Sequence, residues 1–260
     1  MQIDGSLNKY LFLLGGYDLE MLTIRQVLDE QAIAYVDHQL RWDNARVSNY
    51  QKELDDALNQ GYSVFGIELR EDIPVPSGYR RIDHHNELTC LPSALEQVMS
   101  FLHLPMDRYQ QLVAANDKAY IPGMLELDAT KEEIAVIRRA DRKAQGVTAE
   151  DELSAEKAIA QNSEKVGDLL IVHAFSSRFS PICDRLFPYR CLLVYTDSEW
   201  MYYGKGATQI RDYFEEEFLS GKLFCGGGEN GYVGIQYGAY SSDKIQEMVE
   251  HIKIITNGNL

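Results

Sequence analysis

The chain has 260 residues, of which 45% are hydrophobic and 25% charged, which is ordinary for a globular protein of one large or two modest domains. No run of about eighteen apolar residues is present, which argues against a membrane-spanning helix, and Met1–Ser6 lacks the pattern of a signal peptide, so we expect a cytoplasmic protein without a membrane partner. The net charge of −15 repels a long phosphate backbone, so long nucleic acid is not an expected partner, whereas a small substrate is easier to reconcile with it. Assembly into a homo-oligomer stays open.

The first third of the chain alternates strand patterns with helix patterns. Tyr10–Leu14 is a short apolar run that stops at two glycines, which is typical of a buried strand. Apolar residues at helical spacing follow, directly after Asp18, which is a good N-cap residue. The same criteria predict strands over 10–14, 32–36, 63–69 and 79–82, and helices over 19–31, 48–60 and 91–102, the last with Pro92 in its first turn.

This alternation predicts an α/β fold with a parallel sheet and helices on both faces. Ligands of such sheets bind at the carboxyl ends of the strands. Three acidic residues fall at these predicted ends, namely Asp18, Glu68 and Asp83. We therefore expect their carboxylates to gather at one edge of the sheet, as a metal site requires.

The second half begins with a long charged helical region. Residues 130–165 are rich in Ala, Glu, Lys and Arg and predict a connecting pair of helices that turn near Gly146. The alternation then resumes, with strands expected over 169–175, 191–195, 201–204 and 232–237 and helices over 181–186, 207–219 and 243–255. We expect a metal-binding domain over 1–130, a helical connector over 131–166 and a second, smaller α/β domain over 167–260.

The pattern that indicates chemistry is Asp83-His84-His85, at the end of the fourth predicted strand. Carboxylate and imidazole ligands together suit manganese or zinc. Adjacent histidines also occur as structural residues, but here two other strands end in acidic residues as well. The triplet therefore predicts one part of a divalent metal site.

With these residues the chain resembles the DHH phosphoesterase superfamily, over most of its length. The third of four acidic motifs of that family is matched by Arg81–Asn86, and the first is approached by Tyr17–Glu20. The second would be Glu68, with Asp72 as the alternative, and the fourth Asp117. The glycine loop of a DHHA1-like C-terminal domain is matched by Cys225–Tyr232.

Several positions depart from the family pattern. Leu14 stands where the first motif has a histidine, and Glu20 and Glu68 stand where aspartates are usual. In the glycine loop Glu229 replaces a histidine. The longer carboxylates would shift the ligand geometry by about one methylene, and the missing imidazole bears on how many ions the site holds.

The resemblance implies a metal-dependent phosphoesterase that uses Mn²⁺ or Mg²⁺, with two ions per chain. It implies catalytic roles for Asp83, His84 and His85, although His85 would instead be able to donate a hydrogen bond to the phosphate. The metal ligands expected from it are Asp18, Glu20, Glu68, Asp83, His84 and Asp117. Asp18 has an alternative role as a helix cap, and Glu20 as a first-turn acid that faces the helix dipole.

The expected substrate is a small phosphorylated molecule, either a nucleotide, a short oligonucleotide or a similar metabolite. Backbone N–H groups of Gly226, Gly227 and Gly228 would be able to hold its phosphate, or the three glycines would form only a hairpin turn. Lys205 and Arg178 are the expected cationic contacts, and their alternative is a plain surface charge. Two other functions stay open: a catalytically weakened nucleotide-binding module, and an inorganic pyrophosphate or polyphosphate hydrolase.

Overall fold

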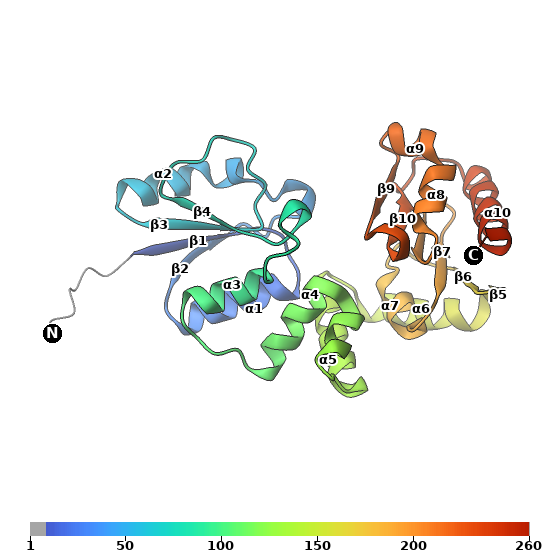
Figure 1. The fold of residues 1–260 in the computed structure, drawn as a ribbon, viewed down its shortest axis with the longest axis horizontal. Helices are drawn as coiled ribbons and strands as arrows, with labels where there is room; N and C mark the ends of the chain where they lie inside the picture. Colours follow the sequence, from blue (N-terminus) through green and yellow to red (C-terminus); the bar gives the residue numbers. More distant parts are fainter. Residues whose placement is uncertain (1–8, 260) are drawn as a thin grey trace. The chain divides into compact units, whose positions relative to one another are not determined.

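The structure is a computed structural model that describes residues 9–259 and divides into two compact units, Met1–Gly146 and Val147–Leu260 (Figure 1). Each unit has its own sheet. Among the described residues, no helix is both long enough and apolar enough to cross a bilayer.

The sheet of the first unit has four parallel strands in the order β2-β1-β3-β4. They are β1 (Tyr10–Leu14), β2 (Ala34–Asp37), β3 (Ser63–Ile67) and β4 (Tyr79–Ile82). Consecutive residues of a strand point to opposite faces, and both faces of the central strands are apolar. Phe12 stacks on Phe65 on one face, whereas Leu13 and Val64 belong to a hydrophobic cluster on the other.

Helices cover both faces of this sheet, as the sequence predicts (Figure 1). Leu54 of α2 (Gln51–Asn59) packs with Leu13 and Val64. The other face carries α1 (Leu19–Glu30) and α3 (Ala94–Phe101), and Phe101 contacts both Phe12 and Phe65.

The helix expected over 91–102 begins later than its sequence suggests. Ser93 is its N-cap, and a capping box joins the Ser93 hydroxyl to the Glu96 backbone and the Glu96 carboxylate to the Ser93 backbone. Pro92 therefore lies outside the helix and not in its first turn. The cause is local, because two satisfied backbone donors fix the helix start more strongly than a proline that is merely tolerated there.

The helical region in the middle of the chain forms three helices: α4 (Arg108–Glu126), α5 (Lys131–Ala144) and α6 (Ala149–Gln161). The first two pack on each other and on α1, so they belong to the first unit. The third packs on α7 (Ser180–Leu186) and on the second sheet. The segment 131–166 is thus divided between the two units at Gly146.

The second unit has a six-stranded mixed sheet in the order β5-β6-β7-β8-β10-β9. Only β6 and β7 pair in parallel. The strands are β5 (Ser163–Val166), β6 (Leu169–His173), β7 (Cys191–Tyr195), β8 (Trp200–Gly204), β9 (Leu223–Gly226) and β10 (Tyr232–Ile235). One face packs against α6 and α7, and the other against α8 (Ala207–Tyr213) and α10 (Ser242–Asn259).

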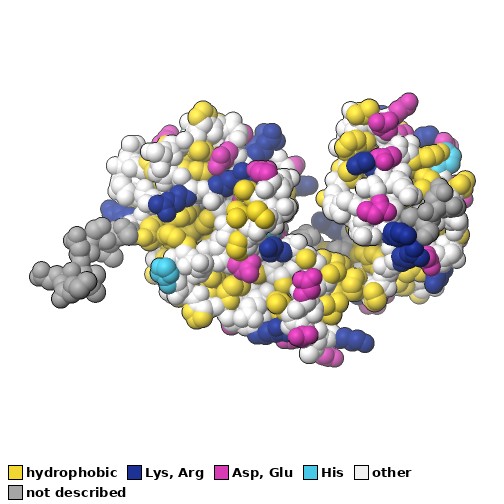
Figure 2. Space-filling view, in the orientation of Figure 1, with side chains coloured by type: hydrophobic (Ala, Val, Ile, Leu, Met, Phe, Trp, Pro, Cys, Tyr) yellow, Lys and Arg dark blue, Asp and Glu magenta, His cyan; other side chains and the backbone are white. Residues whose placement is uncertain are grey.

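Two details of this unit differ from the expectations. The strands β5 and β9 were not predicted. The helix expected over 207–219 is two helices, because α8 ends at Tyr213 and Phe214, with non-helical angles, separates it from α9 (Glu215–Leu219). On the face drawn in Figure 2, acidic and basic side chains of the described residues are interspersed, and no continuous basic stripe is visible.

Candidate metal centre

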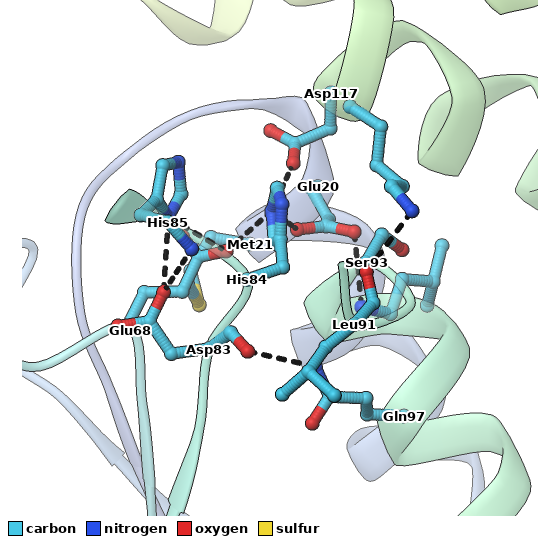
Figure 3. A network of polar contacts seen from close by, with 12 residues as sticks. Glu20, Met21, Glu68, Asp83, His84, His85, Leu91, Ser93, Gln97 and Asp117 are labelled. Atoms are coloured by element: carbon cyan, nitrogen blue, oxygen red, sulfur yellow. Dashed lines mark hydrogen bonds and ion pairs between the residues drawn. The ribbon is translucent and has the colours of Figure 1, made fainter. Parts of the chain in front are cut away.

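The candidate site lies at the carboxyl edge of the first sheet, where β1, β3 and β4 end. Because the strands are parallel and in register, the residues after Leu14, Ile67 and Ile82 meet at one edge. Glu20 follows β1, Glu68 follows β3, and His84 follows β4. Asp117 joins them from α4 (Figure 3).

The centre of the cluster is Nε2 of His84. It lies 2.6 Å from Oδ2 of Asp117, 3.2 Å from Oε1 of Glu68 and 3.9 Å from Oε2 of Glu20. One ligand atom from each of these four residues lies within 4.8 Å of the others, and a second such group joins Glu68 and His84 to His85. Glu68 and His84 are common to both groups, so this edge can offer two overlapping sets of ligands.

Glycine brings the first and third strands close enough for this cluster. The Gly15 amide donates to the Ile67 carbonyl at 2.9 Å. A Cβ on Gly15 would lie only 2.6 Å from the carbonyl oxygens of both Ile67 and Glu68, which no side chain tolerates. The loop after β1 can therefore approach Glu68 only because residue 15 is glycine.

The backbone is strained at the ligand Glu68 and at Tyr120, which lies close to Asp117 in the sequence. Glu68 has a φ of 51°, a left-handed value that is uncommon outside glycine, and this turns the chain out of β3. In α4, Ala119 and Tyr120 have non-helical angles, with Tyr120 at φ 58° and ψ −144°, so the helix is kinked two residues after Asp117. Strain of this kind collects at functional sites, where the surrounding packing holds it.

The acidic residues of the β1–α1 loop have two different roles. Oδ1 of Asp18 accepts a hydrogen bond from the Met21 amide at 2.9 Å and caps α1, as its position predicts. Glu20 is buried and directs Oε1 to the Leu95 amide at the start of α3, at 3.0 Å. Its other oxygen faces His84. Asp18 lies beside the cluster and outside it.

Asp83 is held by neighbours on both of its oxygens. Arg81 donates to Oδ2 from Nε at 3.0 Å and from Nη2 at 2.5 Å. Oδ1 accepts the His85 amide at 2.9 Å and lies 3.1 Å from Nδ1 of His85. The structure therefore does not bring the Asp83 carboxylate into the cluster, and its role as a ligand stays a prediction. Asp72, the alternative to Glu68, instead bonds Ser48 at the surface.

Burial raises the pKa values of three acidic residues at this edge, Asp18, Glu20 and Glu68. It raises the pKa of Asp18 to about 8, with further increases from the charges of Asp117 and Glu68. Burial and the charge of Asp117 also raise the pKa of Glu20, and burial raises that of Glu68. Burial lowers the pKa of His84, but contacts with Asp117 and Glu68 outweigh it and bring that pKa to about 10. The raised carboxyl pKa values favour the protonated, neutral acids, and the raised pKa of His84 favours its protonated ring.

The residues present fit a divalent ion. Among the described residues, buried side-chain atoms without a hydrogen-bond partner include Glu20 Oε2, both carboxylate oxygens of Glu68, His84 Nε2 and Asp117 Oδ2. A buried polar atom without a partner is costly, and most buried polar atoms in folded proteins have one. An ion among these four residues would satisfy them. Three carboxylates and one imidazole are a donor set that suits manganese.

The expected substrate contacts of the second unit lie at two different ends of its sheet. Gly226 ends β9, and its register through Tyr232 and Tyr203 places it at the end of β8, next to Lys205. Gly227 and Gly228 have φ values of 72° and 66° and form the turn that follows. Oε1 of Glu229 accepts the Gly206 amide at 3.1 Å, so the glutamate fastens this loop to the residue after Lys205.

Arg178 is not near the glycine loop. It follows β6, whose last residue, His173, pairs with Tyr195 at the other end of the sheet. The structure therefore brings Lys205 and the three glycines together and leaves Arg178 apart. A small cavity of about 50 Å³ beside the loop is lined by Thr208 and Arg211, which sequence reasoning did not single out.

Three residues around the metal cluster were also missed. They are Arg81, Trp42, whose ring lies 5.9 Å from that of His85, and Gln97, which donates to the Asp83 carbonyl at 3.0 Å. Arg81 did have a signal, since residues i and i+2 at a strand end point to the same side. The other two come from segments distant in the sequence, and no local pattern indicates them.

The strand order and the parallel register define an α/β fold whose acidic residues lie at the carboxyl edge, and this fold is similar to that of a DHH domain. The structure is similar to the DHH domain of a member of the s1p family of ribosomal proteins, with a TM-score of 0.54, 10% identity and coverage of 96% of this chain and 87% of that one. At this identity the similarity shows the fold alone.

Two further solved structures are similar at lower TM-scores. One is a pGpG-specific phosphodiesterase from Vibrio cholerae, with 12% identity, a TM-score of 0.47 and coverage of 97% of this chain and 100% of that one. The other is RecJ from Thermus thermophilus in complex with Mn²⁺, with 12% identity, a TM-score of 0.44 and coverage of 95% of this chain and 52% of that one. No protein-family model matches the sequence, and no curated protein matches it.

Proposed function

We propose that this chain is a metal-dependent phosphoesterase that hydrolyses a phosphoester in a small nucleotide, a short oligonucleotide or a similar phosphorylated metabolite. The observation that carries the proposal is the convergence of buried ligand atoms from Glu20, Glu68 and Asp117 on Nε2 of His84. The DHH-domain fold supports it, because the cluster lies at the strand ends where this architecture binds ligands.

Glu20, Glu68, His84 and Asp117 would hold the ion. We expect Mn²⁺ or Mg²⁺, and a second ion would draw on Glu68, His84 and His85, with Asp18 and Asp83 as further ligands of the set. A bound divalent ion supplies a nucleophilic water at neutral pH and stabilises charge on the phosphoryl oxygens. To bind the ion, the carboxylates must be unprotonated. The buried acids reach this state as the ion binds, because its charge displaces their protons.

His85 would act on the substrate directly. Its side chain is about half exposed, and Asp83 accepts from its ring at Nδ1, which leaves Nε2 for another partner. Contact with Asp83 raises the pKa of His85, so the ring carries a proton more readily at neutral pH. This role is the alternative to ligation of a second ion: a His85 that holds no ion would donate that proton, or a hydrogen bond, to the departing oxygen or to a phosphate oxygen.

In the second unit we propose that Lys205 and the backbone of Gly226–Gly228 contact a terminal phosphate. The left-handed turn leaves the loop without side chains that would block an anion. Arg178 would serve only a different part of the substrate, because it lies at the other end of the sheet.

The test is hydrolysis of a substrate panel by the purified protein with Mn²⁺ or Mg²⁺. Dinucleotides, a model phosphodiester and pyrophosphate separate the possibilities, and Glu68→Gln and Asp117→Asn remove ligands with little change in shape. Turnover of the organic esters that both variants abolish supports the proposal. Turnover of pyrophosphate alone indicates the inorganic hydrolase.

A nucleotide-binding module without catalysis is the second candidate, and one observation favours it. The Arg81 guanidinium occupies the Asp83 carboxylate, so a residue that the resemblance assigns to metal binding is already paired. Tight nucleotide binding without turnover of any ester, in protein that holds metal, would establish this function.

A further inference from the structure

An exposed tryptophan stands at the rim of the metal cluster. Trp42 begins the short 3-10 helix Trp42–Asn44, between β2 and α2, and 47% of it is exposed. The chain has two tryptophans, and the other, Trp200, is completely buried in the core of the second unit. An indole held in solvent beside buried ligand atoms lacks an explanation from core packing.

The Trp42 ring packs against Gly16 so closely that only glycine fits at this position. A Cβ on Gly16 would lie 2.3, 2.5 and 2.6 Å from three consecutive atoms of the six-membered ring of Trp42. Three nearly equal distances place Gly16 against a face of that ring, since an approach in the ring plane would make the middle atom much the nearest. Gly16 has a φ of 68°, so both its conformation and its missing side chain are used here.

His85 lies between Trp42 and the metal cluster. The Trp42 and His85 ring centroids are 5.9 Å apart, with the rings tilted by 55°. Nδ1 of His85 lies 3.8 Å from Oε1 of Glu68, which is one of the buried ligand atoms of the cluster. A phosphate beside Glu68 would therefore have an aromatic ring about one sugar unit away.

We propose that Trp42 stacks on the nucleobase of the substrate while the phosphate of the same nucleotide lies at the metal cluster. This rests on the proposed function and narrows its substrate class to molecules that carry a base. Aromatic side chains stack on every base, because each has a π-face, so Trp42 gives affinity with little choice between bases. An inorganic phosphate would gain nothing from it.

The experiment compares ligands with and without a base. Dissociation constants are measured in Mg²⁺ for non-hydrolysable 5′-phosphonate analogues of AMP, of CMP and of ribose 5-phosphate. Stacking of one base on an aromatic ring should make the two nucleotide analogues bind about 5- to 150-fold tighter than the ribose analogue. Tryptophan fluorescence gives a second readout, because Trp42 is the one of the two tryptophans that is exposed to solvent.

Two variants assign the effect to the ring. Trp42→Ala removes the preference for a base, whereas Trp42→Phe keeps most of it, and calorimetric titration with Mg²⁺ verifies that both variants still form the metal site. Equal affinity of the wild-type protein for all three analogues, or a preference that persists in Trp42→Ala, overturns the inference and leaves the proposed function standing. Failure of the wild-type protein to bind metal overturns both.

Discussion

Arg81 holds Asp83 by a two-pronged contact to a single carboxylate oxygen, and Glu87 lies 3.2 Å from the third nitrogen of the same guanidinium. The contact has a chemical consequence. Although burial acts the other way, hydrogen bonds from His85 and Arg81 hold the pKa of Asp83 well below its usual range, so this carboxylate stays charged and paired. An ion that uses Asp83 must first displace a guanidinium.

We therefore expect two ions to bind with unequal affinity, and Arg81→Met to tighten the weaker one about tenfold or more. A hydrogen bond to a charged group contributes about 1.5–3 kcal/mol, and about 1.4 kcal/mol corresponds to a factor of ten. The first ion, at Glu20, Glu68, His84 and Asp117, should change little. Calorimetric titration with Mn²⁺ measures both constants.

Arg80→Met is the matched control, because Arg80 is the exposed neighbour of Arg81 in the same strand and its guanidinium lies over the Phe65 ring. It should leave both constants unchanged. If the weaker Mn²⁺ ion binds Arg81→Met and the wild-type protein with the same affinity, Arg81 does not compete with metal.

The stability of the metal-free protein should fall as the pH rises. Asp18 has a folded pKa of about 8, against about 3.9 in an unfolded chain. A carboxyl group with a raised folded pKa stabilises the fold below its unfolded pKa, and this contribution is lost as the pH rises toward the folded value. Glu20, Glu68 and His84, whose pKa values are also raised, act in the same direction, and Asp83 opposes it only in strong acid.

Thermal unfolding at pH 5.5 and pH 8, with a chelator and with Mg²⁺, measures this dependence. We expect a lower melting temperature at pH 8 in the chelator, and a larger rise on adding Mg²⁺ at pH 8 than at pH 5.5, because metal replaces protons on the ligands. Glu68→Gln should raise the metal-free melting temperature at pH 8 and remove the response to Mg²⁺. A metal-free melting temperature that stays level or increases between the two pH values contradicts the prediction.

Glu20→Asp should weaken metal binding, even though aspartate is the residue that the family resemblance leads one to expect there. Glu20 spans from α1 to the Leu95 amide with one oxygen and to the His84 side with the other. A side chain one methylene shorter can satisfy only one of these partners. We expect about a 10- to 100-fold loss of Mn²⁺ affinity, the range measured when groups that support metal ligands are removed.

Glu30→Asp, at the exposed end of the same helix, makes the same chemical change away from the site. It should leave Mn²⁺ affinity as it is. If Glu20→Asp binds Mn²⁺ as tightly as the wild-type protein does, the role of the Leu95 contact in positioning Glu20 is wrong.

Gly15→Ala should lower stability and metal affinity together. The new methyl group would meet two carbonyl oxygens at 2.6 Å, and one of them belongs to Glu68, so relief of the clash moves a ligand. Forced overpacking of this kind destabilises by about 1–3 kcal/mol. Thermal unfolding and a Mn²⁺ titration give the two readouts.

Gly61→Ala is the control for Gly15→Ala, because it strains the backbone without causing a clash like the one with the Glu68 carbonyl oxygen. Gly61 has a φ of 80° and no atom within 4 Å of an added Cβ, so its substitution should lower stability with full retention of Mn²⁺ affinity. Undiminished Mn²⁺ binding in Gly15→Ala would mean that the close approach of β1 to Glu68 does not position the ligand.

Most of the first unit could be predicted from its sequence because its signals are local. An apolar run that ends at glycine marks β1 to the residue, and the acids and histidines directly after strands indicate the edge where ligands gather. In the second unit the two strands that were missed, β5 and β9, are the outer strands of their sheet. The edge strand β5 is held by backbone pairing on one side and is largely exposed, so it needs no apolar pattern. The edge strand β9 has only four residues and ends in the glycine loop, so its short apolar run gives little signal of its own.

The sequence by itself determined the parallel sheet, the edge at which its acidic residues collect, and Glu68, His84 and Asp117 as candidate ligands. Tertiary structure alone decided the partner of each carboxylate: Asp83 with Arg81, Glu20 with the Leu95 amide, and it also placed Trp42 against Gly16 beside His85. The physical reason is that strand and helix patterns arise from neighbours along the chain, whereas the partner of a charged or aromatic side chain depends on which distant segments the packing brings within a few ångströms.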